Sequence, residues 1–115
     1  MTQEDKNILL QDLCARLPHE VKIQIGKKPE VEVLNEINLR IGAINSTYAS
    51  IKPYLFPMSS MTPRQKAELA RLTADIEGFF QQMLAEIDFY HRHHIDYRGL
   101  IDMGLAIDAT DLNIY

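Results

Sequence analysis

The residues best suited to chemistry lie in one short stretch, 91–99, which reads HRHHIDYRG. It holds three of the chain's four histidines together with an aspartate, a tyrosine and two arginines. Histidine and aspartate suit two kinds of chemistry: metal coordination, and acid–base catalysis in which a carboxylate orients an imidazole. The same composition is also typical of a helix end that packs onto its own domain. The stretch therefore leaves three interpretations to separate.

A metal site needs three or four converging ligands, and helical geometry works against that here. While a helix lasts, His91 and His94 share one side, but His93 points about 160° away from His91. The candidate ligands are then His91, His94 and Asp96, and we predict no resident metal. The same three residues are the candidates for an acid–base enzyme. Because no P-loop, dinucleotide fingerprint, GxSxG elbow or HExxH motif completes a catalytic site, we expect no catalytic residue and no cofactor.

Composition favours a single globular domain over residues 1–115, with 46% hydrophobic and 24% charged residues. The lone cysteine, Cys14, excludes an intramolecular disulfide and is interpreted as a small core residue. No apolar run approaches the roughly 18 residues of a membrane span, and the first residues are acidic rather than basic. We therefore expect a cytoplasmic protein that does not enter a membrane.

The net charge is −4, and the acidic excess lies in residues 62–115. Duplex binding normally requires clustered Lys and Arg, whereas only Lys27 and Lys28 are adjacent here. We therefore do not expect a nucleic-acid partner. A nucleic-acid adaptor that uses Lys22, Lys27 and Lys28 is the weakest of the functional alternatives.

The first half of the chain predicts a helix followed by strands. Thr2 and Asp5 cap a helix over about residues 3–17, which Pro18 ends. Alternating apolar residues predict a strand over 21–25, then one bent strand or two strands over 31–41, and a short strand over 48–52. Without a crossover helix between them, three or four such strands predict an antiparallel meander.

The second half predicts a long amphipathic helix that begins at Thr62, where Pro63 and Gln65 complete a capping box. Its apolar face comprises Leu69, Leu72, Ile76, Phe79, Phe80, Met83, Leu84, Ile87 and Tyr90. A helix over 62–93 would be ~45–50 Å long and would overhang a domain whose radius of gyration is about 13 Å. Either the helix breaks near Gly78, or its overhanging half packs on a second copy. We predict a mostly continuous helix and a homodimer, with Phe79, Phe80 and Met83 in the contact.

Beyond this helix, Asp96 is predicted to cap a short helix over 97–103 that Gly104 ends. Tyr97 and Arg98 are not needed for that corner and are predicted to face outward as contact residues. The predicted fold is therefore α+β: an N-terminal helix, a three- to four-stranded antiparallel meander, a long amphipathic helix and a short C-terminal helix. A compact β-barrel with flanking helices is the alternative.

Three stretches carry a resemblance: ILLQDLCARLP (8–18), IKPYLFPMSSMT (51–62) and HHIDYRGLIDMGLAIDA (93–109). They resemble a family of short proteins of gut Bacteroides-type bacteria and their phages, for which no activity is established. The resemblance implies a small accessory protein encoded by a phage or mobile element, and it carries over no catalytic or ligand residue. Together with the absent catalytic motifs, it favours a non-catalytic protein–protein interaction module; the alternative is a metal-dependent or acid–base enzyme centred on His91, His94 and Asp96.

Overall fold

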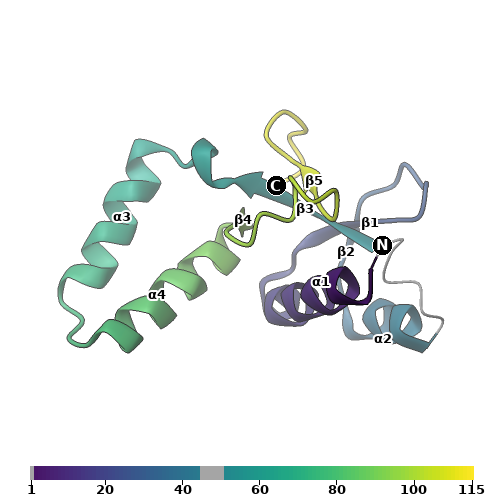
Figure 1. The fold of residues 1–115 in the computed structure, drawn as a ribbon. Coiled ribbons are helices and arrows are strands. Elements are labelled where there is room, and N and C mark those ends of the chain that lie inside the picture. Colours follow the sequence, from purple (N-terminus) through teal and green to yellow (C-terminus); the bar gives the residue numbers. More distant parts are fainter. Residues whose placement is uncertain (1, 45–50) are drawn as a thin grey trace.

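The computed structural model describes residues 2–44 and 51–115, with side chains for all of these except residues 41–44. It confirms the α+β prediction: the chain combines helices with a mixed sheet (Figure 1). The helices are α1 (Gln3–Arg16), α2 (Glu36–Ile44), α3 (Pro63–Ala74) and α4 (Phe79–Arg92), with short 3-10 turns η1 (Leu17–His19) and η3 (Met58–Ser60). The strands are β1 (Lys22–Ile25), β2 (Glu32–Val33), β3 (Ile51–Pro57), β4 (Ile95–Asp96) and β5 (Ile107–Asp108).

The sheet has the order β2-β1-β3-β4, and β5 also pairs with β3. β1 is antiparallel to both β2 and β3, whereas β4 and β5 are parallel to β3. The predicted meander is therefore wrong in its connectivity, because β1 lies between β2 and β3. The helix α2 provides the connection that carries the chain from one side of β1 to the other. Of the predicted strand over 48–52, residues 48–50 lie outside the described residues, and β3 continues beyond the predicted end to Pro57.

The hydrophobic core lies between α1, the sheet and the segment after β4. Its buried members are Leu9, Leu13, Val21, Ile23, Leu34, Ile51, Leu55, Leu100, Leu105 and Ala106. On α1 the inward face follows the helical spacing Leu9, Asp12, Leu13, Arg16. Cys14 lies outside that face and is exposed, so its prediction as a core residue was wrong.

In place of the one bent strand or two strands predicted over 31–41, the chain forms the short strand β2 and the helix α2. Asn35 and Asn38 explain the change, because each side-chain oxygen accepts a hydrogen bond from the other's backbone N–H, at 2.8 and 2.9 Å. This reciprocal pair starts a helix in the manner of a capping box. Ile37, whose alternation with Leu39 indicated a strand, is 71% exposed.

The long helix predicted over 62–93 is two helices, α3 and α4, folded back as a hairpin. The predicted start is confirmed: Thr62 and Gln65 form both hydrogen bonds of the capping box. The chain leaves the helical path after Ala74 and re-enters it at Phe79, with Gly78 at a φ of 91°. A side chain is strongly disfavoured at that φ, so the glycine permits the reversal. The prediction of a continuous helix is therefore wrong, and the alternative break near Gly78 is confirmed.

The short helix predicted over 97–103 is a series of turns. Asp96 still caps it, because its carboxylate accepts hydrogen bonds from the N–H groups of Leu100 and Ile101. Gly104 has a φ of 77° and ends the turns as predicted. Leu100 and Leu105 are buried, so this segment closes the core beside β3 without forming a helix.

The hairpin of α3 and α4 projects from the body that contains the sheet and α1, and it gives the chain dimensions of 44 × 29 × 24 Å (Figure 1). Only the C-terminal end of α4 reaches the body, where it leads directly into β4. None of the helices in the described ranges is long and apolar enough to cross a membrane.

Candidate functional site

Three charged side chains meet where α1, β4 and the following turn come together. Asp12 and Arg16 are both fully buried on the inner face of α1. The Arg16 Nε donates a hydrogen bond to Asp12 Oδ2 at 2.8 Å, and the Arg98 Nε donates to Asp12 Oδ1 at 3.1 Å. Arg16 Nη2 also donates to the carbonyl oxygen of Ile95 at 2.7 Å. Two guanidinium groups therefore share one buried carboxylate, and one of them also binds the β4 backbone.

His91 lies beside this triad at the end of α4. It is 8% exposed, and its Nε2 forms a hydrogen bond with the Tyr97 hydroxyl at 2.8 Å. The guanidinium carbons of Arg98 and Arg16 lie 5.1 and 5.6 Å from the centre of the Tyr97 ring. Burial first, and then the nearby Arg16 charge, lowers the pKa of His91 to about 4. The imidazole is therefore neutral at physiological pH.

His94 takes a different position, in a left-handed turn with a φ of 58°. Its ring stacks on Tyr115 with centroids 3.9 Å apart, and the Tyr115 hydroxyl donates to the Tyr54 carbonyl oxygen and accepts from the Lys22 N–H. Burial lowers the pKa of His94 to about 4 and raises that of Tyr115 to about 12. The buried Nδ1 of His94 has no hydrogen-bond partner among the described residues, so the buried, hydrogen-bonded histidine of this stretch is His91.

The residues of the proposed metal or acid–base site do not come together as one site. The two Asp96 oxygens accept hydrogen bonds from the N–H groups of Leu100 and Ile101, both at 2.9 Å, so this carboxylate holds a turn. Over residues 2–44 and 51–115, no three histidine, cysteine, aspartate or glutamate side chains lie close enough to hold a metal ion. The geometry therefore does not favour the enzyme alternative based on His91, His94 and Asp96.

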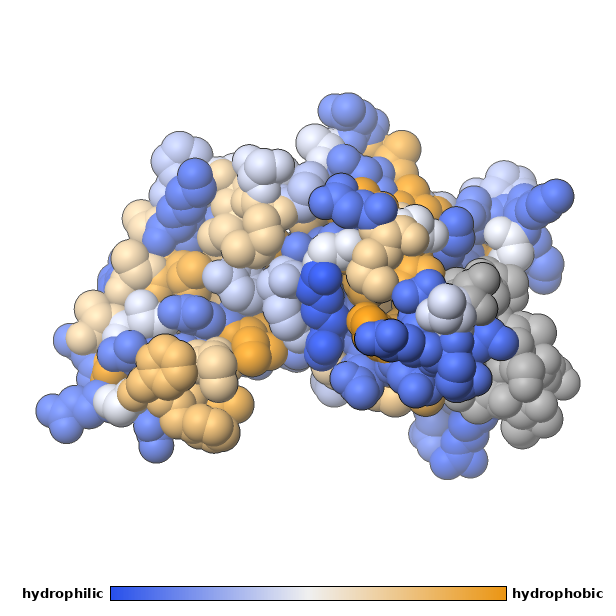
Figure 2. Space-filling model, in the orientation of Figure 1, coloured by the Kyte–Doolittle hydropathy of each residue, from blue (hydrophilic) through white to orange (hydrophobic). Residues whose placement is uncertain are grey.

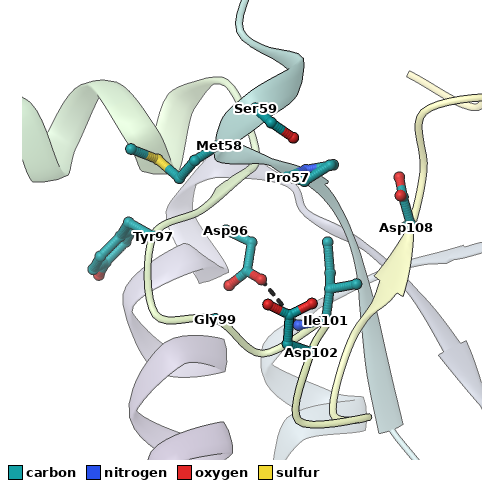
Figure 3. A pocket seen from close by; sticks show the side chains of 9 residues that line it. All are labelled: Pro57, Met58, Ser59, Asp96, Tyr97, Gly99, Ile101, Asp102 and Asp108. Carbon is teal, nitrogen blue, oxygen red and sulfur yellow. Dashed lines mark hydrogen bonds between the residues drawn. The ribbon is translucent and has the colours of Figure 1, made fainter.

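A cavity of about 500 Å³ lies between η3, the turns after β4 and the start of β5 (Figure 3). Pro57, Met58, Ser59, Asp96, Tyr97, Gly99, Ile101, Asp102 and Asp108 line it. Three of these are acidic. The Asp96 carboxylate accepts the hydrogen bonds from Leu100 and Ile101, and Asp108 Oδ1 accepts one from the backbone N–H of Thr110. The cavity is thus a recess with both polar and apolar walls, and two of its three acids hold the turns around it.

An apolar surface lies at the free end of the hairpin. The exposed fractions are 80% for Phe79, 62% for Phe80 and 52% for Leu84, with Leu72 of α3 at 39%. Met83 lies among them, half-buried. In Figure 2 apolar side chains gather over the turn between the two helices and the beginning of α4. Large apolar side chains grouped in this way typically mark an interaction surface.

Tyr97 and Arg98 do not face outward as predicted. Both are half-buried; Tyr97 binds His91 and stacks on Tyr90 at 5.6 Å, and Arg98 binds Asp12. Arg98 is thus turned toward α1 rather than toward solvent. Sequence reasoning missed Asp12 and Arg16. Their only signal was an Asp and an Arg four residues apart on the apolar face of the first helix.

Comparisons with known proteins add no relative: no family model, no curated protein and no solved structure matches this chain.

Proposed function

We propose that this protein is a non-catalytic interaction module, an accessory protein of a phage or mobile element, whose contact element is the α3–α4 hairpin. The exposure of Phe79, Phe80 and Leu84 at the hairpin's free end carries the proposal. The three sequence stretches 8–18, 51–62 and 93–109 support the phage or mobile-element origin. These two parts of the proposal are independent of each other.

The energy at stake in the exposed surface supports a role in binding. Fully burying a side chain such as Phe or Leu stabilises by roughly 1.5–3 kcal/mol relative to leaving it in water. Phe79, Phe80 and Leu84 forgo most of this gain in the isolated chain. Phenylalanines on a rigid helix also lose little conformational freedom when a partner covers them. The hairpin end therefore has the composition of the central part of an interface.

The root of the hairpin is well suited to present that surface in a fixed direction. At the end of α4, His91 binds Tyr97, and the next strand is held by the hydrogen bond from Arg16 to Ile95. The Phe56 N–H also donates to the His94 carbonyl oxygen at 2.8 Å, which joins this end to β3. The hairpin thus extends from a base that is tied to both α1 and the sheet.

A binding experiment tests the proposal with Phe79→Asp/Phe80→Asp as the contact variant. These residues are the first two of α4, where acidic side chains suit the helix dipole, so the helix should form. The control is Ile37→Asp, because Ile37 is the second residue of α2 and is 71% exposed. The partner can be another protein or a second copy of the chain. We expect it to bind the purified wild type and Ile37→Asp with equal affinity, and to bind the double variant at least about 30-fold more weakly. Equal binding of every purified partner to all three proteins would refute the role of the hairpin.

A further inference from the structure

The side chain of Tyr115 closes a gap in the sheet. The pairing of β1 with β3 ends at the pair Ile23 and Pro53. One position further, the Tyr115 hydroxyl accepts a hydrogen bond from the Lys22 N–H at 2.8 Å and donates one to the Tyr54 carbonyl oxygen at 2.7 Å. A single hydroxyl therefore connects the two strands where their own ladder stops.

His94 forms the wall against which Tyr115 is held. The two rings are stacked, with centroids 3.9 Å apart and an angle of 16° between their planes. His94 reaches this position through a left-handed backbone with a φ of 58°, which is uncommon for a residue other than glycine. Its Nδ1 is buried and has no hydrogen-bond partner among the described residues. An imidazolium carries a proton on both ring nitrogens, so protonated His94 would bury an N–H without an acceptor.

The charges around His94 also oppose a proton there. The charged groups that act on it are basic and come from α1, η1, β1 and the neighbouring residue: Arg16, His19, Lys22 and His93. Burial first, and then the Arg16 charge, lowers the pKa of His94 to about 4. The Lys22 ammonium already lies 5.4 Å from the centroid of the Tyr115 ring, so an imidazolium on the same ring would meet a second cation. The stack is therefore built for a neutral His94.

We propose that His94 and Tyr115 form an acid-released latch, in which protonation of His94 drives the 112–115 segment out of the gap between β1 and β3 before the core unfolds. The segment can leave by itself because it lies outside the core. Along the described chain the last buried residue is Ala109, and Tyr115 as a whole is 41% exposed. Apart from the Tyr115 contacts, a hydrogen bond from Lys22 Nζ to the Ile114 carbonyl oxygen holds the segment. Segments tied by so few contacts open locally, at a lower free energy than the whole domain.

The direction and size of the pH effect follow from the two states of the latch. The pKa of His94 is about 4 in the closed form and should return to its usual 6.5 in the open form, where the ring meets water. The open form therefore binds protons first as the pH drops. The ratio of open to closed molecules should rise about 20-fold between pH 7 and pH 5, and it levels off below pH 4, where both forms are protonated.

Amide hydrogen exchange measured by NMR tests the latch. The Lys22 N–H reports it directly, because its hydrogen-bond acceptor is the Tyr115 hydroxyl. The Leu34 N–H, which donates to the Val21 carbonyl oxygen at 2.8 Å, reports opening of the core. After correction for the intrinsic exchange rate, we expect Lys22 to be less protected than Leu34 at every pH and to lose protection about 20-fold between pH 7 and pH 5. Equal protection at the two amides, or protection of Lys22 that does not change with pH, would refute the latch.

Two histidine variants identify the group that titrates. His94→Asn tolerates the positive φ and should make the protection of Lys22 independent of pH between 7 and 5. His91→Gln removes the other histidine of low pKa, and it should leave the loss of Lys22 protection as in the wild type. If His91→Gln abolishes the pH dependence and His94→Asn does not, the latch is overturned.

A titration of His94 by NMR supplies a measurement that does not depend on exchange. In Tyr115→Ala the ring that covers His94 is gone, so the pKa of His94 should rise from about 4 toward 6.5. Tyr115→Phe keeps the stacked ring but lacks the hydroxyl. It should leave the pKa of His94 closer to 4 than Tyr115→Ala does, while Lys22 loses protection at every pH. A pKa of His94 that stays near 4 in Tyr115→Ala would show that Tyr115 does not hold His94 neutral and would rule out the latch.

Discussion

Replacing Asp12 by alanine should be the most damaging single polar substitution in the described part of the chain. Asp12 and Arg16 are fully buried, and the Asp12 carboxylate is the acceptor for both Arg16 and Arg98. Its removal leaves the Arg16 guanidinium buried with only the hydrogen bond to the Ile95 carbonyl oxygen, and Arg98 loses its acceptor as well. Breaking a buried ion pair from one side typically costs about 3–5 kcal/mol, because a buried charge stays uncompensated. Domains of this size have free energies of unfolding of roughly 5–15 kcal/mol, so much of the stability should be lost.

Urea denaturation followed by circular dichroism measures this loss of stability, and two matched variants serve as comparisons. Glu36→Ala breaks the exposed ion pair between Glu36 and Arg40, of the same i,i+4 type, and should change the free energy of unfolding by no more than ~0.5 kcal/mol. Asp12→Leu/Arg16→Met removes the buried pair as a whole and should cost clearly less than Asp12→Ala, since no lone charge is left inside. If Asp12→Ala costs no more than Glu36→Ala, the triad is not the buried, coupled structure described here.

Further predictions concern the hairpin and the histidines. Gly78→Ala should lower the free energy of unfolding by ~1–2 kcal/mol, because the positive φ disfavours a side chain and the new Cβ would also meet the Gln81 side chain. Gly104 has open space around it, so Gly104→Ala should lower the free energy of unfolding by less in the same urea titration. Thr62→Ala removes the cap of α3 and should cost about 1 kcal/mol, visible as faster amide exchange in the first turn of α3. Because the pKa values of His91 and His94 are lowered from 6.5 to about 4, the unfolded chain binds protons first as the pH drops. The contribution of these two groups to stability is therefore full above pH 6.5, falls as the pH drops from 6.5 to about 4, and levels off below 4, where both states are protonated. Replacing His94 with asparagine, which tolerates its positive φ, should make this fall shallower in urea midpoints measured from pH 7 to 4.

The elements predicted correctly are those whose signals are local. Thr62, Pro63 and Gln65 define the start of α3 through their own side chains and backbone, without help from the rest of the fold. The first helix and β1 are predicted correctly for the same reason. The α2 segment failed because two signals competed there. Period-2 apolar spacing indicates a strand, whereas the reciprocal cap formed by Asn35 and Asn38 favours a helix, and the cap prevails in the structure.

The site was harder to predict because it depends on pairs of residues far apart in the chain. The bond from Arg98 to Asp12 spans 86 residues and the one from Arg16 to Ile95 spans 79. No local pattern around Arg98 shows that it turns inward, so an outward position was a natural but wrong prediction. Phe79 and Phe80 were identified as contact residues from an overhanging continuous helix. Both residues are exposed even though the helix is not continuous, because the hairpin places them away from the body.

The buried triad and the exposed hairpin are connected by the chain itself. Arg16 holds the carbonyl of Ile95, and Ile95 lies three residues beyond the end of α4 at Arg92. The hairpin joins the body only through this end and through η3 at the start of α3, so its direction depends on contacts that Asp12 keeps in place. Asp12→Ala should therefore weaken partner binding through Phe79 and Phe80 in addition to lowering stability, even under conditions where the variant is still folded. Measuring the partner's affinity for folded Asp12→Ala beside the wild type decides this: equal affinity would mean that the hairpin is oriented without the triad.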